Sequence, residues 1–259
     1  MLILWDIDQT LIDLAVADRR MWSEICASLL DVAPQPIDPE PGCTIRSILH
    51  QGLLRHGASD AQAACLLPEA LAAEVSWLSD RDRLRRKGRL IDGAEQALRE
   101  MAHTPGVIQT VLTGNQRDSA RLKLDAFGLS DYLSLEFGAY GSDSDHRAAL
   151  VGIARERVSE RYGSGEAEVA VLVGDSVRDV MAARESATPI IAVSSGKTSP
   201  SELRTAGADA VLRTLNDHDG FRAALSLVGR RPARSTRSGD LARPDRPGRD
   251  EESPASFNA

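Results

Sequence analysis

Cysteine, excess positive charge and long apolar runs are all scarce in this sequence. Its three cysteines, Cys26, Cys43 and Cys65, are odd in number and have no Cys-x-x-Cys spacing. Neither a disulfide framework nor a zinc site is therefore expected, and packing in the interior is the simplest role for the thiols.

No stretch approaches the roughly 20 apolar residues that a membrane-spanning helix needs. The opening apolar run has no basic flank and reaches Asp6 too early for a signal peptide. We therefore predict a cytoplasmic protein with no membrane partner.

Acidic residues outnumber basic ones, with 38 Asp and Glu against 31 Lys and Arg and a formal net charge of -7. Because binding to nucleic acid depends on Lys and Arg matched to phosphates, we expect no nucleic-acid partner. The expected ligand is a small molecule.

The segment 231–259 differs from the rest of the chain. It contains four prolines and many charged residues, and Leu241 and Phe257 are its only sizeable apolar residues. It cannot bury enough surface to offset the entropy lost on ordering, so we predict a disordered tail. The remaining chain is long enough to bury a sizeable core.

The segment 14–89 has apolar residues at helical spacing and is predicted to be helical throughout. One such stripe contains Met21, Trp22, Ile25 and Leu29. After Leu90, apolar strands alternate with helices, which is typical of a parallel sheet with crossover helices. The predicted strands are 107–113, 133–140, 168–175, 189–193 and 209–215, and the helices between and after them are 115–127, 145–162, 177–187 and 220–228.

These patterns predict an α/β protein with a doubly wound parallel sheet. Residues 1–13 and 90–230 would form its core, and the all-helical segment 14–89 would be inserted directly after the first strand. In such sheets the ligand lies beyond the carboxyl ends of the strands.

Polar residues follow three of the predicted strands, where each strand ends. Asp6 and Asp8 follow the first strand, Thr113-Gly114-Asn115 ends the second, and Asp175 ends the fourth, with Asp179 one helical turn later. If these strands are neighbours, four carboxylates converge. Any one of these acids could serve only as a helix N-cap, but capping does not explain Asp6 and Asp8 together.

Such an acidic cluster needs a positive partner, because like charges at about 4 Å repel by several kcal/mol at an effective dielectric near 20. Carboxylate oxygens without His or Cys favour Mg²⁺. The turn at Thr113-Gly114-Asn115 offers a hydroxyl and free backbone N–H groups for an anion. Metal, acids and anion cradle together predict a phosphate substrate.

The sequence resembles the haloacid dehalogenase-like phosphohydrolases, and in particular their phosphoglycolate phosphatase-like subgroup with a helical cap. Three motifs in a fixed order, each at the end of an apolar strand, carry the resemblance: Asp6-x-Asp8-x-Thr10-Leu11, then Thr113, then Gly174-Asp175-Ser176-x-x-Asp179.

The resemblance implies roles for the matching residues. Asp6 would attack phosphorus, and Asp8 would protonate the leaving alkoxide and then deprotonate water. The Asp6 side chain, the Asp8 carbonyl and Asp175 would hold Mg²⁺, with Asp179 in support. Thr113 would bind the phosphoryl oxygens. An acid at position 8 favours phosphate over carbon–halogen substrates, because a halide leaves without a proton.

Two positions depart from the family pattern. Gln9 stands where Gly is usual, and a glutamine adopts positive φ only at a cost. The usual Lys-Pro pair of the third motif is missing, and Arg147 is our first candidate for its cation, with Lys123 as the alternative.

The sequence therefore predicts a Mg²⁺-dependent phosphatase acting on a small phosphate monoester. Two alternatives stay open: a sugar phosphomutase, which would use the same core residues, and a catalytically silent binding protein of the same fold.

Overall fold

The computed structural model describes residues 1–163, 165 and 169–229. The predicted disordered tail at 231–259 lies outside the described residues. Among the helices that are described, none has the length and apolar character needed to cross a membrane.

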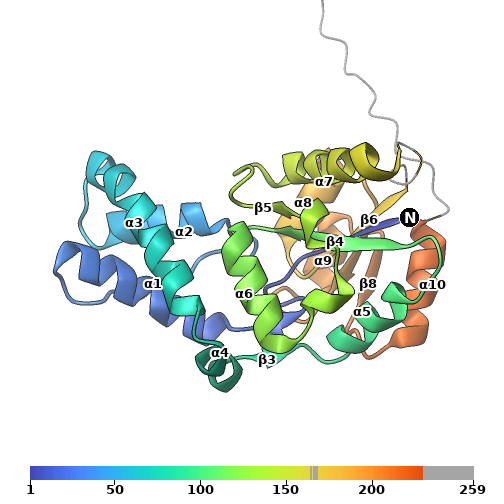
Figure 1. Ribbon diagram of the computed structural model, residues 1–259, viewed down its shortest axis with the longest axis horizontal. Coiled ribbons are helices and arrows are strands. Elements are labelled where there is room, and N and C mark those ends of the chain that lie inside the picture. Colours follow the sequence, from blue (N-terminus) through green and yellow to red (C-terminus); the bar gives the residue numbers. More distant parts are fainter. Residues whose placement is uncertain (164, 166–168, 230–259) are drawn as a thin grey trace, which may run out of the picture.

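A six-stranded sheet forms the centre of the molecule, with strand order β5-β4-β1-β6-β7-β8 (Figure 1). Every neighbouring pair in it is parallel. The predicted α/β fold with a parallel sheet is confirmed. The strands are β1 (Leu2–Trp5), β4 (Ile108–Thr113), β5 (Ala139–Tyr140), β6 (Ala170–Gly174), β7 (Ile190–Val193) and β8 (Ala210–Leu212).

Strand β1 lies between β4 and β6, in the middle of the sheet. Trp5 is in register with Val111 on β4 and with Val173 on β6. All four β1 residues are fully buried, as an apolar run covered on both faces requires. The residues that follow β1, β4 and β6 therefore leave the sheet side by side.

Helices cover both faces of the sheet. Alternation along β1 sends Ile3 and Trp5 into one apolar cluster and Leu2 and Leu4 into the other. The first cluster is completed by α5 (Ala94–Ala102), α6 (Arg117–Phe127) and α10 (His218–Val228), and the second by α7 (Arg147–Tyr162), α8 (Val177–Glu185) and α9 (Pro200–Ala206).

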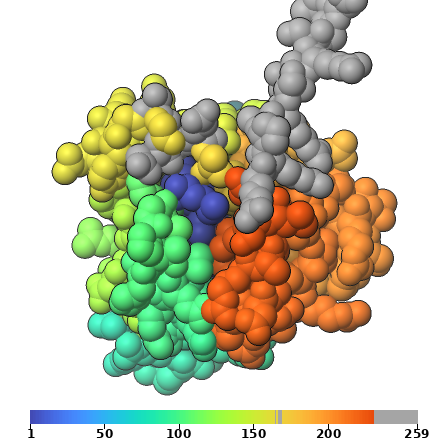
Figure 2. Space-filling view, turned by 90° about the vertical axis from the view of Figure 1, so that its right-hand side faces the viewer, coloured from blue at the N-terminus to red at the C-terminus, as the bar shows by residue number. Residues whose placement is uncertain are grey.

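The start of the chain is anchored at the end of the sheet away from the polar strand exits. The Met1 ammonium donates a hydrogen bond of 2.6 Å to the carbonyl of Gly106, just before β4. Figure 2 shows these first residues between the surfaces formed by α5 and α10. The Trp5 ring, further along β1, stacks on Phe221 of α10 with ring centroids 5.5 Å apart.

Four helices occupy the predicted helical segment, and the first three of them lie at one end of the molecule (Figure 1). They are α1 (Ala15–Leu30), α2 (Ile45–Arg55), α3 (Asp60–Leu78) and α4 (Arg81–Lys87), and α1, α2 and α3 pack against one another. Thr44 caps α2, and Ser59 forms a capping box with Gln62 at the start of α3.

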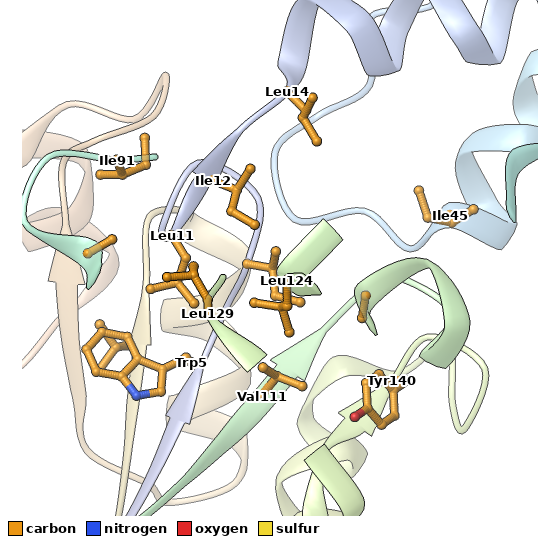
Figure 3. Close-up of a cluster of buried hydrophobic side chains, with 14 of the residues drawn as sticks. Trp5, Leu11, Ile12, Leu14, Ile45, Ile91, Val111, Leu124, Leu129 and Tyr140 are labelled. Atoms are coloured by element: carbon orange, nitrogen blue, oxygen red, sulfur yellow. The ribbon is translucent and has the colours of Figure 1, made fainter. Parts of the chain in front are cut away.

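One apolar cluster joins these helices to the sheet. It extends from Trp5 and Val111 through Leu11 and Leu124 to Leu14 and Ile45 (Figure 3). The helical segment is thus packed onto the core by buried apolar surface as well as by its chain connections.

Two short strands join the ends of the helical segment, and the sequence prediction missed them. β2 (Ile12–Asp13) pairs antiparallel with β3 (Arg89–Leu90), and Arg89 forms an ion pair of 2.9 Å with Asp13. Arg89 was predicted to end the helical segment but lies in this strand. Both connections between helices and sheet therefore lie next to each other.

The predicted strand 133–140 is largely wrong. Within it β5 is the one strand, and β5 follows two short 3-10 helices, η1 (Ser130–Tyr132) and η2 (Leu135–Phe137). In η2 the N–H groups of Phe137 and Gly138 bond to carbonyls three residues back, so they do not pair with β4. The Tyr140 hydroxyl donates to the Leu135 carbonyl at 2.6 Å and holds this turn.

Other predicted elements are present with shifted ends. The helix predicted from 145 begins at Arg147, and the helix predicted to end at 187 ends at Glu185. The prediction that the cysteines pack in the interior is correct for Cys26, which is buried. Cys43 is only partly buried, and Cys65 is exposed.

Candidate active site

Three acidic side chains meet where β1 and β6 end. Asp6 directly follows β1, Asp175 directly follows β6, and Asp179 lies in the first turn of α8. One oxygen from each lies within 4.8 Å of the others, and all three residues are buried. The expected meeting of the strand exits is confirmed, because β1 and β6 are hydrogen-bonded neighbours.

Arg147, the first residue of α7, bridges two of these acids. Its Nη2 lies 2.7 Å from Asp6 Oδ1 and 2.5 Å from Asp179 Oδ1. The Arg147 side chain is only 9% exposed, so the contacts form with little screening by water. Of the two cations proposed for the third motif, Arg147 is the one that contacts Asp6.

The acidic cluster holds more negative charge than Arg147 compensates. Burial raises the pKa of Asp6 to about 7, although the Arg147 charge opposes this rise. Burial also raises the pKa of Asp175 well above its usual value, and the neighbouring charges of Asp6 and Asp179 add to the effect. A further cation would restore the ionised forms of these carboxyl groups.

The donor set fits Mg²⁺. It consists of carboxylate oxygens, the hard ligands that this ion prefers, with no His or Cys in the cluster. Among the described residues, Asp175 Oδ2 is a buried oxygen with no hydrogen-bond partner. Gly196 leaves room on that side, since a Cβ there would lie 1.9 Å from the same oxygen. These observations agree with a site built for a small divalent ion.

The turn between β4 and α6 lies beside the acids. Gly114 and Asn115 line the same cavity as Asp6 and Asp175. Thr113 is fully buried, and its hydroxyl oxygen accepts hydrogen bonds from the backbone N–H (3.2 Å) and the side-chain amide (2.8 Å) of Asn115. In this arrangement Thr113 orients Asn115, and Gly114 and Asn115 border the cavity.

Asp8 lies at the same exit but its side chain takes different partners. Its Oδ2 accepts a hydrogen bond of 2.6 Å from Asn115 Nδ2, and its Oδ1 accepts one of 2.8 Å from Lys123 Nζ. The side chain is 38% exposed and borders the cavity with Asp6. The four predicted carboxylates therefore divide into a triad around Asp6 and a separate Asp8.

Two buried acids near Asp8 were not anticipated from the sequence. Asp18 of α1 accepts a hydrogen bond of 3.0 Å from Lys123, and burial raises its pKa to about 6. Glu74 of α3 accepts hydrogen bonds from Ser119 and Gln116, and burial raises its pKa to about 7.

A signal for these acids was present in the helical spacing. Asp18 lies four residues after Leu14 and three before Met21, and Glu74 lies three after Leu71 and four before Leu78. Both acids thus fall on the apolar faces of their helices, where a carboxylate needs a buried partner.

Lys123, the alternative candidate for the third-motif cation, forms ion pairs with Asp8 and Asp18 and not with Asp6. It is completely buried, and its ammonium lies between Asp8 and Asp18. Burial alone would lower the pKa of Lys123, but the charges of Asp18 and Asp8 raise it above its usual value. The ammonium group is therefore charged.

Gln9 adopts the backbone conformation that favours glycine. Its φ is 66°, and its N–H donates to the Ile12 carbonyl in a tight turn. Its side-chain amide donates to Asp13 at 2.8 Å, and its carbonyl accepts from the Ser195 hydroxyl at 2.6 Å. The departure from the family pattern thus leaves the turn in place, at a conformational cost.

A cavity lies between the sheet exits and the helical segment. Its floor is formed by Asp6, Asp8 and Asp175, and its far wall by α1, α2 and the loop 39–43. Lys197, after β7, reaches from the sheet to Asp38 across the cavity's rim with an ion pair of 2.6 Å. A ligand at the acids would therefore contact both parts of the chain.

This fold and this site define a class of protein, the α/β enzymes whose acidic residues gather at the exits of a parallel sheet. The sequence profile of the haloacid dehalogenase-like hydrolases matches residues 1–186. The chain belongs to this family, and the protein is a hydrolase.

Individual relatives agree in sequence and fold. The chain is 28% identical over 244 residues to a phosphoglycolate phosphatase of Caulobacter vibrioides, covering 90% of this chain and 94% of the relative. A predicted phosphatase from Clostridium acetobutylicum has the same fold, with a TM-score of 0.63 and 19% identity over 86% of this chain and 97% of that one.

A third relative has a different assignment on the same fold. It is a protein from Bacteroides vulgatus that has been assigned as a β-phosphoglucomutase. Its TM-score is 0.61, and it is 16% identical over 89% of this chain and 90% of that one. At such identities the two structural comparisons establish the fold alone.

Proposed function

We propose that the protein is a Mg²⁺-dependent phosphatase that hydrolyses a small phosphate monoester through an aspartyl-phosphate intermediate. The observation that carries the proposal is the contact of Arg147 with Asp6 beside the buried carboxylates of Asp175 and Asp179. The contact supports the proposal because Asp6 as nucleophile, Arg147 as positive charge and the acids as metal ligands would then act within one small volume.

Asp6 is the proposed nucleophile. Its attack on phosphorus forms the acyl–phosphate bond and releases the substrate's alkoxide. Arg147 holds Asp6 Oδ1 and brings positive charge close to the phosphoryl oxygens, where negative charge accumulates in the transition state.

Asp8 is the proposed general acid and base. Its carboxyl gives a proton to the leaving oxygen, and the resulting carboxylate then takes a proton from the water that cleaves the aspartyl phosphate. Its place at the cavity beside Asp6 supports this assignment.

The turn after β4 is the proposed phosphate cradle. Gly114 and Asn115 border the cavity, and the Thr113 hydroxyl accepts a hydrogen bond from the Asn115 amide. The Asn115 N–H already donates to the Thr113 hydroxyl, so the attraction for an anion comes from the partial positive charge at the start of α6.

The Mg²⁺ ligands would be the Asp6 and Asp175 side chains and the Asp8 carbonyl, with Asp179 in support. When bound, the ion supplies positive charge that draws phosphate to the site and neutralises the acids. Asp179 also bonds to the Ser176 N–H at 3.0 Å, which fixes the start of α8.

The helical segment 14–89 is the proposed cap on a core formed by residues 1–13 and 90–230. It forms one wall of the cavity and would exclude bulk water from the reaction. The Caulobacter vibrioides relative is a phosphoglycolate phosphatase, which favours a small substrate.

Phosphate release by the purified protein tests the proposal. With Mg²⁺ and a panel that includes p-nitrophenyl phosphate and 2-phosphoglycolate, the wild type should release phosphate, and Asp6→Asn should lower the rate at least 1,000-fold, a size typical of a lost nucleophile. Asp31→Asn, an exposed acid after α1, is the matched control and should act like the wild type.

Two other results would contradict the proposal. Interconversion of sugar phosphates faster than phosphate release would indicate the mutase alternative. Absence of turnover on the whole panel, with phosphate esters still bound, would indicate a silent binding protein.

A further inference from the structure

Lys123 is a buried cation that the proposed reaction does not use. Its side chain has no exposure to solvent, and its Nζ lies 2.8 Å from Asp8 Oδ1 and 3.0 Å from Asp18 Oδ2. The three residues come from different segments: Asp8 follows β1, Asp18 lies on α1 and Lys123 lies on α6.

A contribution to stability does not by itself explain why Lys123, Asp8 and Asp18 are placed together. Burying an ammonium and a carboxylate costs several kcal/mol in lost hydration, and their attraction often only balances that cost. An apolar pair of similar size would join α1 to α6 at least as well. One partner, Asp8, borders the cavity, so the charged group points to a role at the site.

The contacts leave Asp8 little freedom. Lys123 holds one oxygen, and the Asn115 amide holds the other at 2.6 Å. Asn115 is itself fixed by Thr113. A proton-transfer group must lie within hydrogen-bond reach of the reacting oxygen, so a fixed carboxyl group gives up its proton more efficiently than a mobile one.

Asp18 in turn holds Lys123 from the side of the helical segment. Without Asp18, the ammonium would have Asp8 as its one direct carboxylate partner among the described residues, and a flexible lysine would have more positions available. Asp18 lies in the first turn of α1, so this contact exists only when the start of α1 lies beside α6.

We propose that Lys123, held by Asp18, is a positioning residue that fixes Asp8 for proton transfer and makes this placement depend on the packing of α1 against the core. The inference rests on the proposed phosphatase function.

Lys123 gives up and accepts no proton in the proposed reaction. When the ester P–O bond breaks, its electron pair goes to the leaving oxygen, which takes the Asp8 proton. Asp8 is then a carboxylate, and the adjacent ammonium stabilises it until water returns a proton. Lys123 keeps its own protons throughout.

The dependence of the rate on the leaving group shows whether Lys123 positions Asp8 or only stabilises the fold. The departure of p-nitrophenolate needs no proton, whereas an alkoxide does, so loss of a well-placed Asp8 should affect alkyl phosphates more. The quantity to measure is kcat/KM, which reports the first phosphoryl transfer and excludes later hydrolysis of the intermediate.

The experiment compares p-nitrophenyl phosphate with the best substrate among ethyl phosphate, glycerol 3-phosphate and 2-phosphoglycolate. Lys123→Met should lower kcat/KM for the alkyl ester at least 10-fold more than for p-nitrophenyl phosphate. Asp18→Asn should act in the same direction with a smaller factor, because it keeps an acceptor but removes the charge.

Matched controls lie on the same helices. Arg121→Met on α6 and Glu24→Gln on α1 change exposed charges and should leave the ratio of the two substrates unchanged. If Lys123→Met does not fold, Asp18→Asn, which keeps the lysine, decides the outcome.

Equal losses on the two substrates, or no loss on either, would overturn the inference. Failure of the proposed function gives a different result, because the wild type would then hydrolyse no member of the set, or Asp6→Asn would remain active.

Discussion

Arg147 Nη2 lies 2.7 Å from Asp6 Oδ1, although 141 residues separate the two in the chain. The same nitrogen contacts Asp179 at 2.5 Å. One guanidinium thus links the exit of β1 to the start of α8 and balances part of the charge of the acidic cluster.

Replacing Arg147 should separate the need for positive charge from the need for a guanidinium. A lysine nitrogen can contact both acids as Nη2 does, so Arg147→Lys should keep activity within about 10-fold. Arg147→Met leaves buried carboxylates uncompensated, so it should lower phosphatase activity by about 100-fold or more and the free energy of unfolding by about 3 kcal/mol. Phosphate release and urea unfolding measure these effects, and Arg161→Met, exposed on the same helix, is the control. Full activity in Arg147→Met would contradict the assignment.

Mg²⁺ should stabilise the folded protein through Asp175. At a concentration 100 times the dissociation constant, a ligand that binds only the folded state adds about 2.7 kcal/mol. Thermal unfolding with and without Mg²⁺ measures this gain, which Asp175→Asn should largely remove. Asp219→Asn, at a side chain 94% exposed, should respond like the wild type. An equal Mg²⁺ response in Asp175→Asn would place the ion elsewhere.

Glu74 should make the protein less stable as pH rises. Burial raises its pKa from 4.5 to about 7, so the folded state holds a proton that the unfolded chain has already released between these values. The contribution of Glu74 is therefore fully present below pH 4.5 and is lost as pH rises to about 7.

A neutral amide at position 74 should remove that dependence. Glu74→Gln should match the wild type near pH 5 and exceed its free energy of unfolding near pH 8, by an amount on the order of 1 to 3 kcal/mol. Urea unfolding across this pH range measures the difference. Glu69→Gln changes an exposed acid on the same helix, and its free energy of unfolding should change with pH as that of the wild type does. A constant difference between Glu74→Gln and wild type at all pH values would refute the explanation.

The positive φ of Gln9 should favour glycine over alanine at this position. Both Gln9→Gly and Gln9→Ala lose the side-chain hydrogen bond to Asp13, so their comparison isolates the backbone. Because a Cβ costs about 1 kcal/mol in the left-handed region, Gln9→Gly should be more stable than Gln9→Ala by about that amount. Chemical denaturation measures the difference, and greater stability of the alanine variant would contradict the argument.

The strand exits could be predicted from the sequence because their signals are local. An apolar run followed by Asp6 and Asp8 predicts a buried strand with functional residues at its end. The apolar run before Asp175 predicts the same. Once the fold was expected to be a parallel sheet, the meeting of these exits followed. The segment 133–140 could not be predicted in this way, because its apolar residues suit a strand and a packed 3-10 turn equally well.

Residue order and spacing within short windows were enough to predict the fold class, the helical segment after the first strand and the acids at the strand exits, because each of these features has a local signal. The pairing of cations with acids became known from the folded chain, in which Arg147 contacts Asp6 and Lys123 lies between Asp8 and Asp18. Ion pairs join residues more than a hundred positions apart, and their energies depend on distance and burial, which no local pattern records.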